Sequence, residues 1–292
     1  MNILITGAGG FLGSALALRL SRMDHQVSLL IRENTNLHRL ADLSPYNIGR
    51  CESDQKINKF ISDISPDIVI HTACCYGKNG ESALQLIDSN IRYGAVILKA
   101  LNSLSKRITF INTGTVLSRD VSLYALTKTQ FEEFGKYIGR SSHQALQFIN
   151  LKLQHMYGPG DDLSKFTSFV INACKNNVPA LPLTFGEQKR DFIYIDDVVD
   201  AYVRILENMT TFKGQQQIEL GSGAAPRLRD FVEIAHKLTN SKTELLFGQI
   251  PYRENDAMSM VANIDILKGL GWLPKFDIEA GIKKTIEMDS MI

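Results

Sequence analysis

The sequence predicts an α/β protein, a doubly wound parallel sheet with a smaller C-terminal lobe. An apolar β-type segment at residues 3–5 runs straight into three glycines spaced three apart, Gly7, Gly10 and Gly13. Short apolar runs then alternate with helical patterns through the first half of the 292 residues, which is typical of parallel strands joined by crossover helices. A chain of this length can bury a large core and still form a second lobe. Together these features indicate a Rossmann architecture.

The elements expected along that half follow in order. Strands are predicted for the apolar runs 2–6, 26–31, 67–72, 107–112 and 146–152, and the intervening helical patterns begin near Leu12, Ile57, Ser82, Tyr124 and Lys165. The regular alternation ends after residues 157–160, which read Tyr-Gly-Pro-Gly. We therefore expect a Rossmann domain of residues 1–164 and about 190–222, and a smaller lobe of about 165–189 and 223–292.

The glycine turn predicts a phosphate-binding site. After a buried strand, one glycine permits the tight turn, one lets the backbone approach a pyrophosphate, and one lets the next helix pack closely with its N-terminus facing the phosphates. The context favours this function over a purely structural turn. An apolar helical stripe follows at Leu12, Leu16 and Leu20, and a second strand comes at the expected distance. We therefore expect a dinucleotide cofactor here.

The second strand is followed directly by Arg32, nineteen residues after Gly13. An acidic residue at this position accepts a hydrogen bond from the ribose 2′-hydroxyl of NAD, whereas a cation suits the 2′-phosphate of NADP. Arg32 therefore favours NADP(H) over NAD(H). The alternative is a solvated residue at a strand end. His38 and Arg39 follow closely enough to share the phosphate.

Composition argues against several other classes of protein. The formal net charge is +1, without a basic run or an acidic tail, so neither nucleic acid nor a membrane is an expected partner. The first strand starts almost at Met1 and no apolar stretch approaches membrane-spanning length, which predicts a cytoplasmic protein. Cys51, Cys74, Cys75 and Cys174 lack metal-ligand spacing, so no metal site is predicted and free thiols are expected, with a redox role for the vicinal pair as the alternative.

Candidate catalytic side chains lie at two places. Tyr124 and Lys128 are one helical turn apart and so share a helix face. A phenol has a reference pKa of about 10, and a nearby ammonium lowers that pKa toward working pH. Thr113 and Thr115 follow the strand at 107–112, at the carboxyl edge of the sheet where open α/β proteins bind ligands. A chance pair on a surface helix and ordinary turn threonines are the respective alternatives.

With these residues in place, the chain resembles the extended short-chain dehydrogenase/reductase family, in its nucleotide-sugar branch, over nearly its whole length. Beyond the glycines and the candidate catalytic residues, the resemblance rests on His71-Thr72-Ala73, Asn90, the Tyr-Gly-Pro-Gly of 157–160, the Arg-Asp-Phe-Ile-Tyr-Ile-Asp-Asp of 190–197, and Leu270-Gly271-Trp272. It implies that Tyr124 exchanges a proton with a sugar hydroxyl or carbonyl. Lys128 would hold the nicotinamide ribose and lower the tyrosine pKa, and Thr113 would orient the sugar oxygen.

The resemblance also implies binding roles. The expected cofactor-binding residues are Gly7, Gly10, Phe11, Leu12, Gly13, Arg32, Thr72, Ala73, Asn90, Tyr124 and Lys128. The expected residues for a nucleoside-diphosphate sugar are Thr113, Thr115, His155, Arg190 and Arg253. Both arginines would bind the diphosphate, because guanidinium groups offer paired donors and keep their charge, with a surface arginine as the alternative for each. A homodimer is implied, with the helices at 82–104 and 124–138 pairing across a two-fold axis.

Departures from the family pattern select the reaction. Dehydratases of this branch carry an aspartate and a glutamate directly after the catalytic threonine, where this chain has Gly114 and Thr115. Arg32 favours reduction by NADPH. The resemblance therefore implies NADPH-dependent reduction of the C4 ketone of a dTDP- or CDP-linked 4-keto-6-deoxyhexose, in deoxysugar biosynthesis for surface polysaccharide such as O-antigen. An NAD-dependent nucleotide-sugar 4-epimerase and a non-catalytic nicotinamide-sensing protein are the alternatives.

Overall fold

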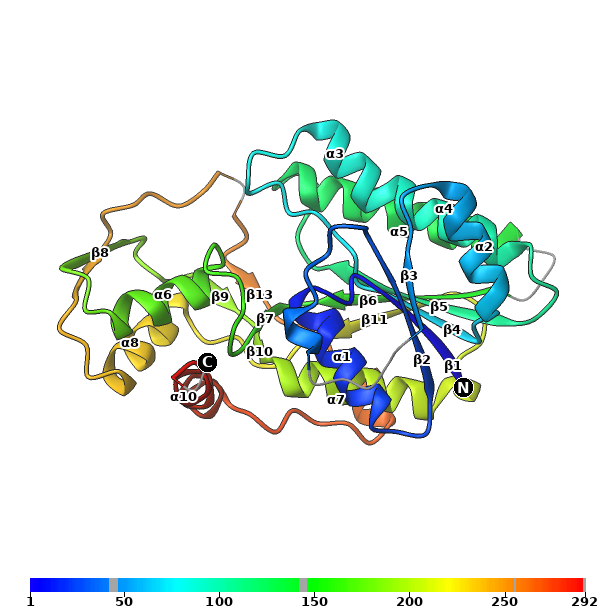
Figure 1. Cartoon of the computed structure of the whole chain (residues 1–292). Coiled ribbons are helices and arrows are strands. Elements are labelled where there is room, and N and C mark those ends of the chain that lie inside the picture. Colours follow the sequence, from blue (N-terminus) through cyan, green and yellow to red (C-terminus); the bar gives the residue numbers. More distant parts are fainter. Residues whose placement is uncertain (42–46, 142–145, 255, 291–292) are drawn as a thin grey trace. The chain divides into compact units, whose positions relative to one another are not determined.

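The computed structural model describes residues 1–41, 47–141, 146–254 and 256–290 (Figure 1). The chain forms two compact units, Met1–Lys152 with Leu206–Ile218, and Leu153–Ile205 with Glu219–Ile292. The division expected from the sequence instead assigns 153–164, 190–205 and 219–222 to the first domain. Among the described residues, none of the helices combines the length and the apolar character needed to cross a bilayer.

A seven-stranded sheet in the order β11-β6-β5-β4-β1-β2-β3 organises the fold. Its strands are β1 (Asn2–Thr6), β2 (Gln26–Ile31), β3 (Asn47–Arg50), β4 (Ile68–His71), β5 (Ile108–Thr115), β6 (Leu146–Leu153) and β11 (Gln216–Leu220). Pairing from β3 through β2, β1 and β4 to β5 is parallel, with Ile5 opposite both Leu29 and Ile70. The predicted doubly wound parallel sheet is confirmed.

Helices cover both faces of this sheet within the first unit. Figure 1 shows α1 on one face and α2, α4 and α5 together on the other. These elements are α1 (Phe11–Ser21), η1 (His38–Leu40), α2 (Asp54–Ile64), α3 (Ala83–Ile87), η2 (Asp88–Arg92), α4 (Tyr93–Asn102), α5 (Leu123–Ser141) and η3 (Met209–Thr211). The turn η2 is π-helical and joins α3 to α4 without a break. The predicted helix starts lie within three residues of the observed ones.

The core of the first unit is built around aromatic rings beneath α5. Phe110 on β5 and Phe148 on β6 stack at 5.6 Å, and Phe131 from α5 meets both edge-on. All three side chains are fully buried. Buried positions recur along α5 at spacings of three and four residues, which is why this helix packs one face against the sheet. Burying a phenylalanine contributes about 1.5–3 kcal/mol, so these rings hold α5 firmly in register.

The second unit contains short parallel strand pairs and a layer of helices. Its elements are β7 (His155–Tyr157), α6 (Phe166–Lys175), β8 (Ala180–Leu183), β9 (Lys189–Arg190), β10 (Phe192–Tyr194), α7 (Ile195–Glu207), α8 (Leu228–Leu238), β12 (Glu244–Phe247), β13 (Ser259–Met260), α9 (Asp265–Gly269) and α10 (Ile278–Met288). The pairs are β7 with β10, β8 with β12 and β9 with β13. Phe231 of α8 packs on Tyr157 and Phe192, which places aromatic rings at the centre of this unit.

Candidate functional site

The glycine turn brings three backbone segments into contact. Gly7 has a φ of +71°, and a Cβ there would lie 2.6 Å from the amide nitrogen of Ala73, so a side chain is excluded. The amide of Gly10 donates to the Gly7 carbonyl at 2.9 Å, and Gly10 is the N-cap of α1. Gly10 makes no side-chain cap and the first turn of α1 has no acid, so the N-terminus of this helix suits an anion.

Close packing continues at Gly13, where a Cβ would overlap the Gly7 carbonyl and lie 2.8 Å from the hydroxyl of Thr72. Thr72 in turn donates from Oγ1 to the carbonyl of Thr6 at 2.7 Å, which ties the end of β4 to β1. The guanidinium of Arg39 lies 5.8 Å from the centre of the Phe11 ring at the start of α1. The cradle is thus bare backbone beside a helix N-terminus, and these residues fit a dinucleotide pyrophosphate.

Arg32 is exposed at the end of β2 and donates from Nη2 to the hydroxyl of Ser89 at 3.0 Å. Ser89 lies in the π-helical turn η2, directly before Asn90. The buried amide of Asn90 accepts from the Cys75 backbone amide at 2.7 Å, and donates to the Cys75 carbonyl and to the Thr127 hydroxyl at 2.9 Å each. Ser89 was not predicted, and nothing in the local sequence distinguishes it from an ordinary helix serine.

The ring of Tyr124 packs on Tyr76 with centroids 4.8 Å apart. Burial raises the pKa of Tyr124 most, and Cys74 raises it further, while hydrogen bonds with Thr115 and Tyr76 lower it by less. The sequence predicts that Lys128 brings this pKa down toward neutrality. In the structure the net shift is upward instead, because loss of solvation outweighs the stabilising contacts. Tyr124 is therefore a protonated phenol at neutral pH.

Lys128 lies one turn further along α5 and is only 3% exposed. Burial lowers its pKa, and two neighbours, Cys74 and Glu132, act in the opposite direction. The same ammonium acts on His71 at the end of β4. Burial, followed by the charge of Lys128, lowers the pKa of His71 to about 3. The histidine is therefore neutral, with Nδ1 2.8 Å from the hydroxyl of Thr6.

Thr113 lies inside β5, which extends to Thr115, three residues beyond the predicted strand end. Next to it, a Cβ at Gly114 would lie 2.7 Å from Oδ1 of the buried Asn150 on β6. This position therefore cannot hold a larger residue without displacing Asn150. The glycine that departs from the dehydratase pattern is required by packing.

The second unit gathers a separate set of polar residues. Arg190 is 4% exposed, forms an ion pair of 2.6 Å with Asp256 and donates to the carbonyl of Ala257 at 2.6 Å. Burial, then the charge of Arg190, lowers the pKa of His155 to about 4, with Asp256 opposing. Arg253 is exposed, and its carbonyl accepts from the amide of Asp256 at 3.2 Å. The structure thus brings Arg190 and His155 together and links the Arg253 segment to them through Asp256.

Asp191, the neighbour of Arg190, organises the backbone around this cluster. Its buried carboxylate accepts from the amide and hydroxyl of Ser222 at 2.6 and 2.7 Å. It also accepts from the amides of Gly223 and Ala262, each at 3.0 Å. Four hydrogen bonds to one carboxylate hold three chain segments of this unit together.

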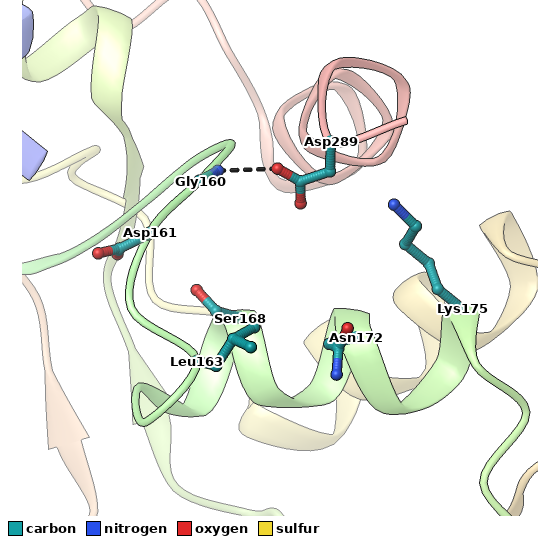
Figure 2. Close-up of a pocket in the computed structure, with 7 residues that line it drawn as sticks. All are labelled: Gly160, Asp161, Leu163, Ser168, Asn172, Lys175 and Asp289. Carbon is teal, nitrogen blue, oxygen red and sulfur yellow. Dashed lines mark hydrogen bonds between the residues drawn. The ribbon is translucent and has the colours of Figure 1, made fainter. Parts of the chain in front are cut away.

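A hollow of about 280 Å³ lies elsewhere in the second unit, beside α6 and the end of α10 (Figure 2). Asp289 accepts from the amide of Gly160 at 2.7 Å at its rim, and Lys175, Asn172 and Ser168 line it from α6. The residues that line it include none of those predicted to bind cofactor or sugar nucleotide.

Comparisons with known proteins agree with the fold described above. A model of the NAD dependent epimerase/dehydratase family matches residues 3–221. The chain is 31% identical to CDP-abequose synthase of Salmonella typhimurium, over 98% of this chain and 97% of that protein. It is 27% identical to dTDP-4-dehydro-6-deoxyglucose reductase of Escherichia coli, over 98% and 96%. Its fold is similar to that of UDP-glucuronic acid 4-epimerase from Bacillus cereus, solved with UDP-glucuronic acid and NAD, with a TM-score of 0.85, 22% identity, and coverage of 100% and 99%.

The buried imidazole of His71 predicts a loss of stability in mild acid. Because its pKa is about 3 when folded and about 6.5 in an unfolded chain, the unfolded state binds more protons between these values. Its contribution is fully present above about pH 6.5, and about 2 kcal/mol of it is lost by pH 5. Urea unfolding at both pH values should therefore show a shallower pH dependence for His71→Gln than for the wild type. The exposed His38→Gln serves as control, and equal slopes in all three proteins would refute the assignment.

Proposed function

We propose that this chain, which belongs to the NAD-dependent epimerase/dehydratase family within the extended short-chain dehydrogenases/reductases, is a nucleotide-sugar 4-ketoreductase. Its substrate would be a nucleoside-diphosphate 4-keto-6-deoxyhexose, dTDP- or CDP-linked, and its cofactor NADPH. The proposed role is in deoxysugar biosynthesis for surface polysaccharide such as O-antigen. The relatives named for CDP-abequose and deoxyhexose synthesis match over nearly their whole length, which supports this substrate class.

The observation that carries the proposal is the state of Tyr124, a protonated phenol on the same helix face as the buried Lys128. Reduction of a ketone requires an acid that starts protonated. A phenol is protonated at neutral pH, and burial raises the pKa of Tyr124 further. Gly114 supports reduction over dehydration, because Asn150 leaves no room for an acidic side chain there.

The proposed roles follow from the positions of these side chains. A bound nicotinamide supplies the hydride to sugar C4. Tyr124 donates its proton to the carbonyl oxygen, and Thr113 and Thr115 at the end of β5 polarise that oxygen. Lys128 holds the nicotinamide ribose and stabilises the phenolate that Tyr124 becomes.

In the second unit, the proposed partners of the diphosphate are Arg190 and Arg253, and His155 is a further proposed contact to the sugar nucleotide. Arg190 is already held in place by Asp256, and guanidinium groups keep their charge when buried. The cytoplasm is the proposed compartment, since the four cysteines are free thiols and a reducing environment keeps them so.

The direct test is the loss of NADPH absorbance when purified protein meets dTDP- or CDP-linked 4-keto-6-deoxyglucose, with NADH run in parallel. Consumption with one sugar nucleotide is expected and would identify its base. Protein that consumes neither cofactor, carries NAD from purification and interconverts two sugar nucleotides would instead be a 4-epimerase.

Replacing Tyr124 by phenylalanine should abolish the proton donor while keeping the ring that packs on Tyr76. We expect kcat to fall by about 100- to 10,000-fold, as is typical for loss of a general acid. The Kd for NADPH, measured by fluorescence titration, should change little. Turnover that survives this substitution would show that another group protonates the carbonyl.

The substitution Arg32→Ala should change the cofactor preference. A charge-assisted hydrogen bond to a phosphate contributes about 1.5–3 kcal/mol, so the Kd for NADPH should rise about 10- to 100-fold. The Kd for NADH should stay nearly constant, because its ribose lacks the phosphate. Isothermal titration with both cofactors measures the ratio, and equal losses would remove the argument for NADP.

We further propose a homodimer through α3 and α5, which contact each other in the first unit. On α3, Leu84 is 72% exposed and Ile87 40% exposed, and on α5, Phe134 is 38% exposed and Tyr137 67% exposed. Leu84→Glu combined with Tyr137→Glu should convert a dimer to a monomer in light scattering after size exclusion. Leu163→Glu, at a leucine of the second unit that is 60% exposed, should leave the dimer intact. A wild-type monomer would refute this pairing.

A further inference from the structure

Within the described part of the chain, one carboxylate acts on the buried ammonium of Lys128. It belongs to Glu132, four residues further along α5. Glu132 is itself only 7% exposed. An ammonium buried without compensation is expensive and tends to lose its proton. Residues at i and i+4 lie side by side on a helix, so Glu132 is placed to offset this cost.

The carboxylate of Glu132 is anchored from its other side. Lys136, a further turn along α5, reaches it with Nζ 2.5 Å from Oε1, and the same Nζ donates to Oε1 of Gln217 on β11 at 3.0 Å. Lys136 is the more exposed partner, with 26% of its side chain accessible against 9% for Glu132. Glu132 therefore lies between a buried cation and a partly exposed one.

The other groups around Lys128 do not replace this carboxylate. His71, from the end of β4, is neutral near pH 7. Cys74, from the segment after β4, also acts on Lys128, through a thiol and not a carboxylate. Tyr124 on the same helix is a protonated phenol. Among these groups, Glu132 is thus the one carboxylate.

We propose that Glu132 is a positioning residue that keeps Lys128 in its ammonium form, and that Lys136 moderates this effect by sharing the carboxylate. The inference rests on the proposed function, since it assigns Lys128 to the bound cofactor and to the phenolate of Tyr124. A surface ion pair between Glu132 and Lys136 that only stabilises α5 would be the competing explanation.

The test compares the alkaline loss of NADPH binding in the wild type, Glu132→Gln and Lys136→Gln, by fluorescence titration from about pH 6 to about pH 10. Coulomb's law with an effective dielectric constant of about 20 gives a shift of roughly one pH unit for two unit charges about 10 Å apart, and a larger shift at shorter separations. Glu132→Gln should move the midpoint of the loss down by about one unit, and Lys136→Gln should move it up. Glu132→Asp, which keeps the charge, should restore most of the shift.

Thermal melts of the same variants separate the two explanations. If the pair only stabilises α5, Glu132→Gln and Lys136→Gln lower Tm alike, and their midpoints equal that of the wild type, which overturns the proposal. Absence of a midpoint in the wild type and in Glu132→Gln overturns it as well. Because cofactor binding is measured without sugar, a failure to reduce 4-keto sugars would refute the proposed function and leave this result standing. With an active enzyme, the alkaline limb of kcat should shift in the same directions.

Discussion

The close approach of Gly7 to Ala73 is the contact on which the first unit depends. It joins the turn after β1 to the segment after β4, and it leaves a Cβ no room. That segment continues into Cys74, whose thiol acts on Lys128, and into Cys75, whose backbone is bonded to Asn90. The contact between Gly7 and Ala73 therefore also positions these two cysteines. The phosphate cradle and the candidate catalytic helix face are therefore positioned by one backbone contact.

Burial acts on three ionisable groups at this edge and affects each according to its chemistry. It keeps His71 neutral, holds Tyr124 protonated and weakens the hold of Lys128 on its proton. In each case the low-polarity surroundings disfavour the charged form. Among these three groups, only Lys128 has a carboxylate, that of Glu132, among the groups that act on it. The positive charge of the lysine is therefore offset by a nearby negative charge.

The sequence predicted the parts of the fold that local pattern determines. Strands β1 and β2 match their expected ranges, because buried parallel strands are continuous apolar runs. Strand β3 was missed, since a short edge strand with one buried residue carries no such run. The pairing of Arg190 with Asp256 spans 66 residues, and Glu132 has the spacing of an ordinary surface ion pair. Such features arise from tertiary packing, and the sequence shows only the residues that take part.

The π-helical turn η2 lets two neighbouring residues make contacts in different directions. Within it, Ser89 meets Arg32 while the next residue, Asn90, is buried against Cys75 and Thr127. A π turn accommodates one extra residue, and each residue of an α-helix accounts for about 100° of rotation. Deleting one residue between 88 and 92 would give a more regular helix, yet it would rotate α3 against α4 by about that angle. The π turn thus sets the rotation of α3 relative to α4, so that each of these two helices packs against its own neighbours.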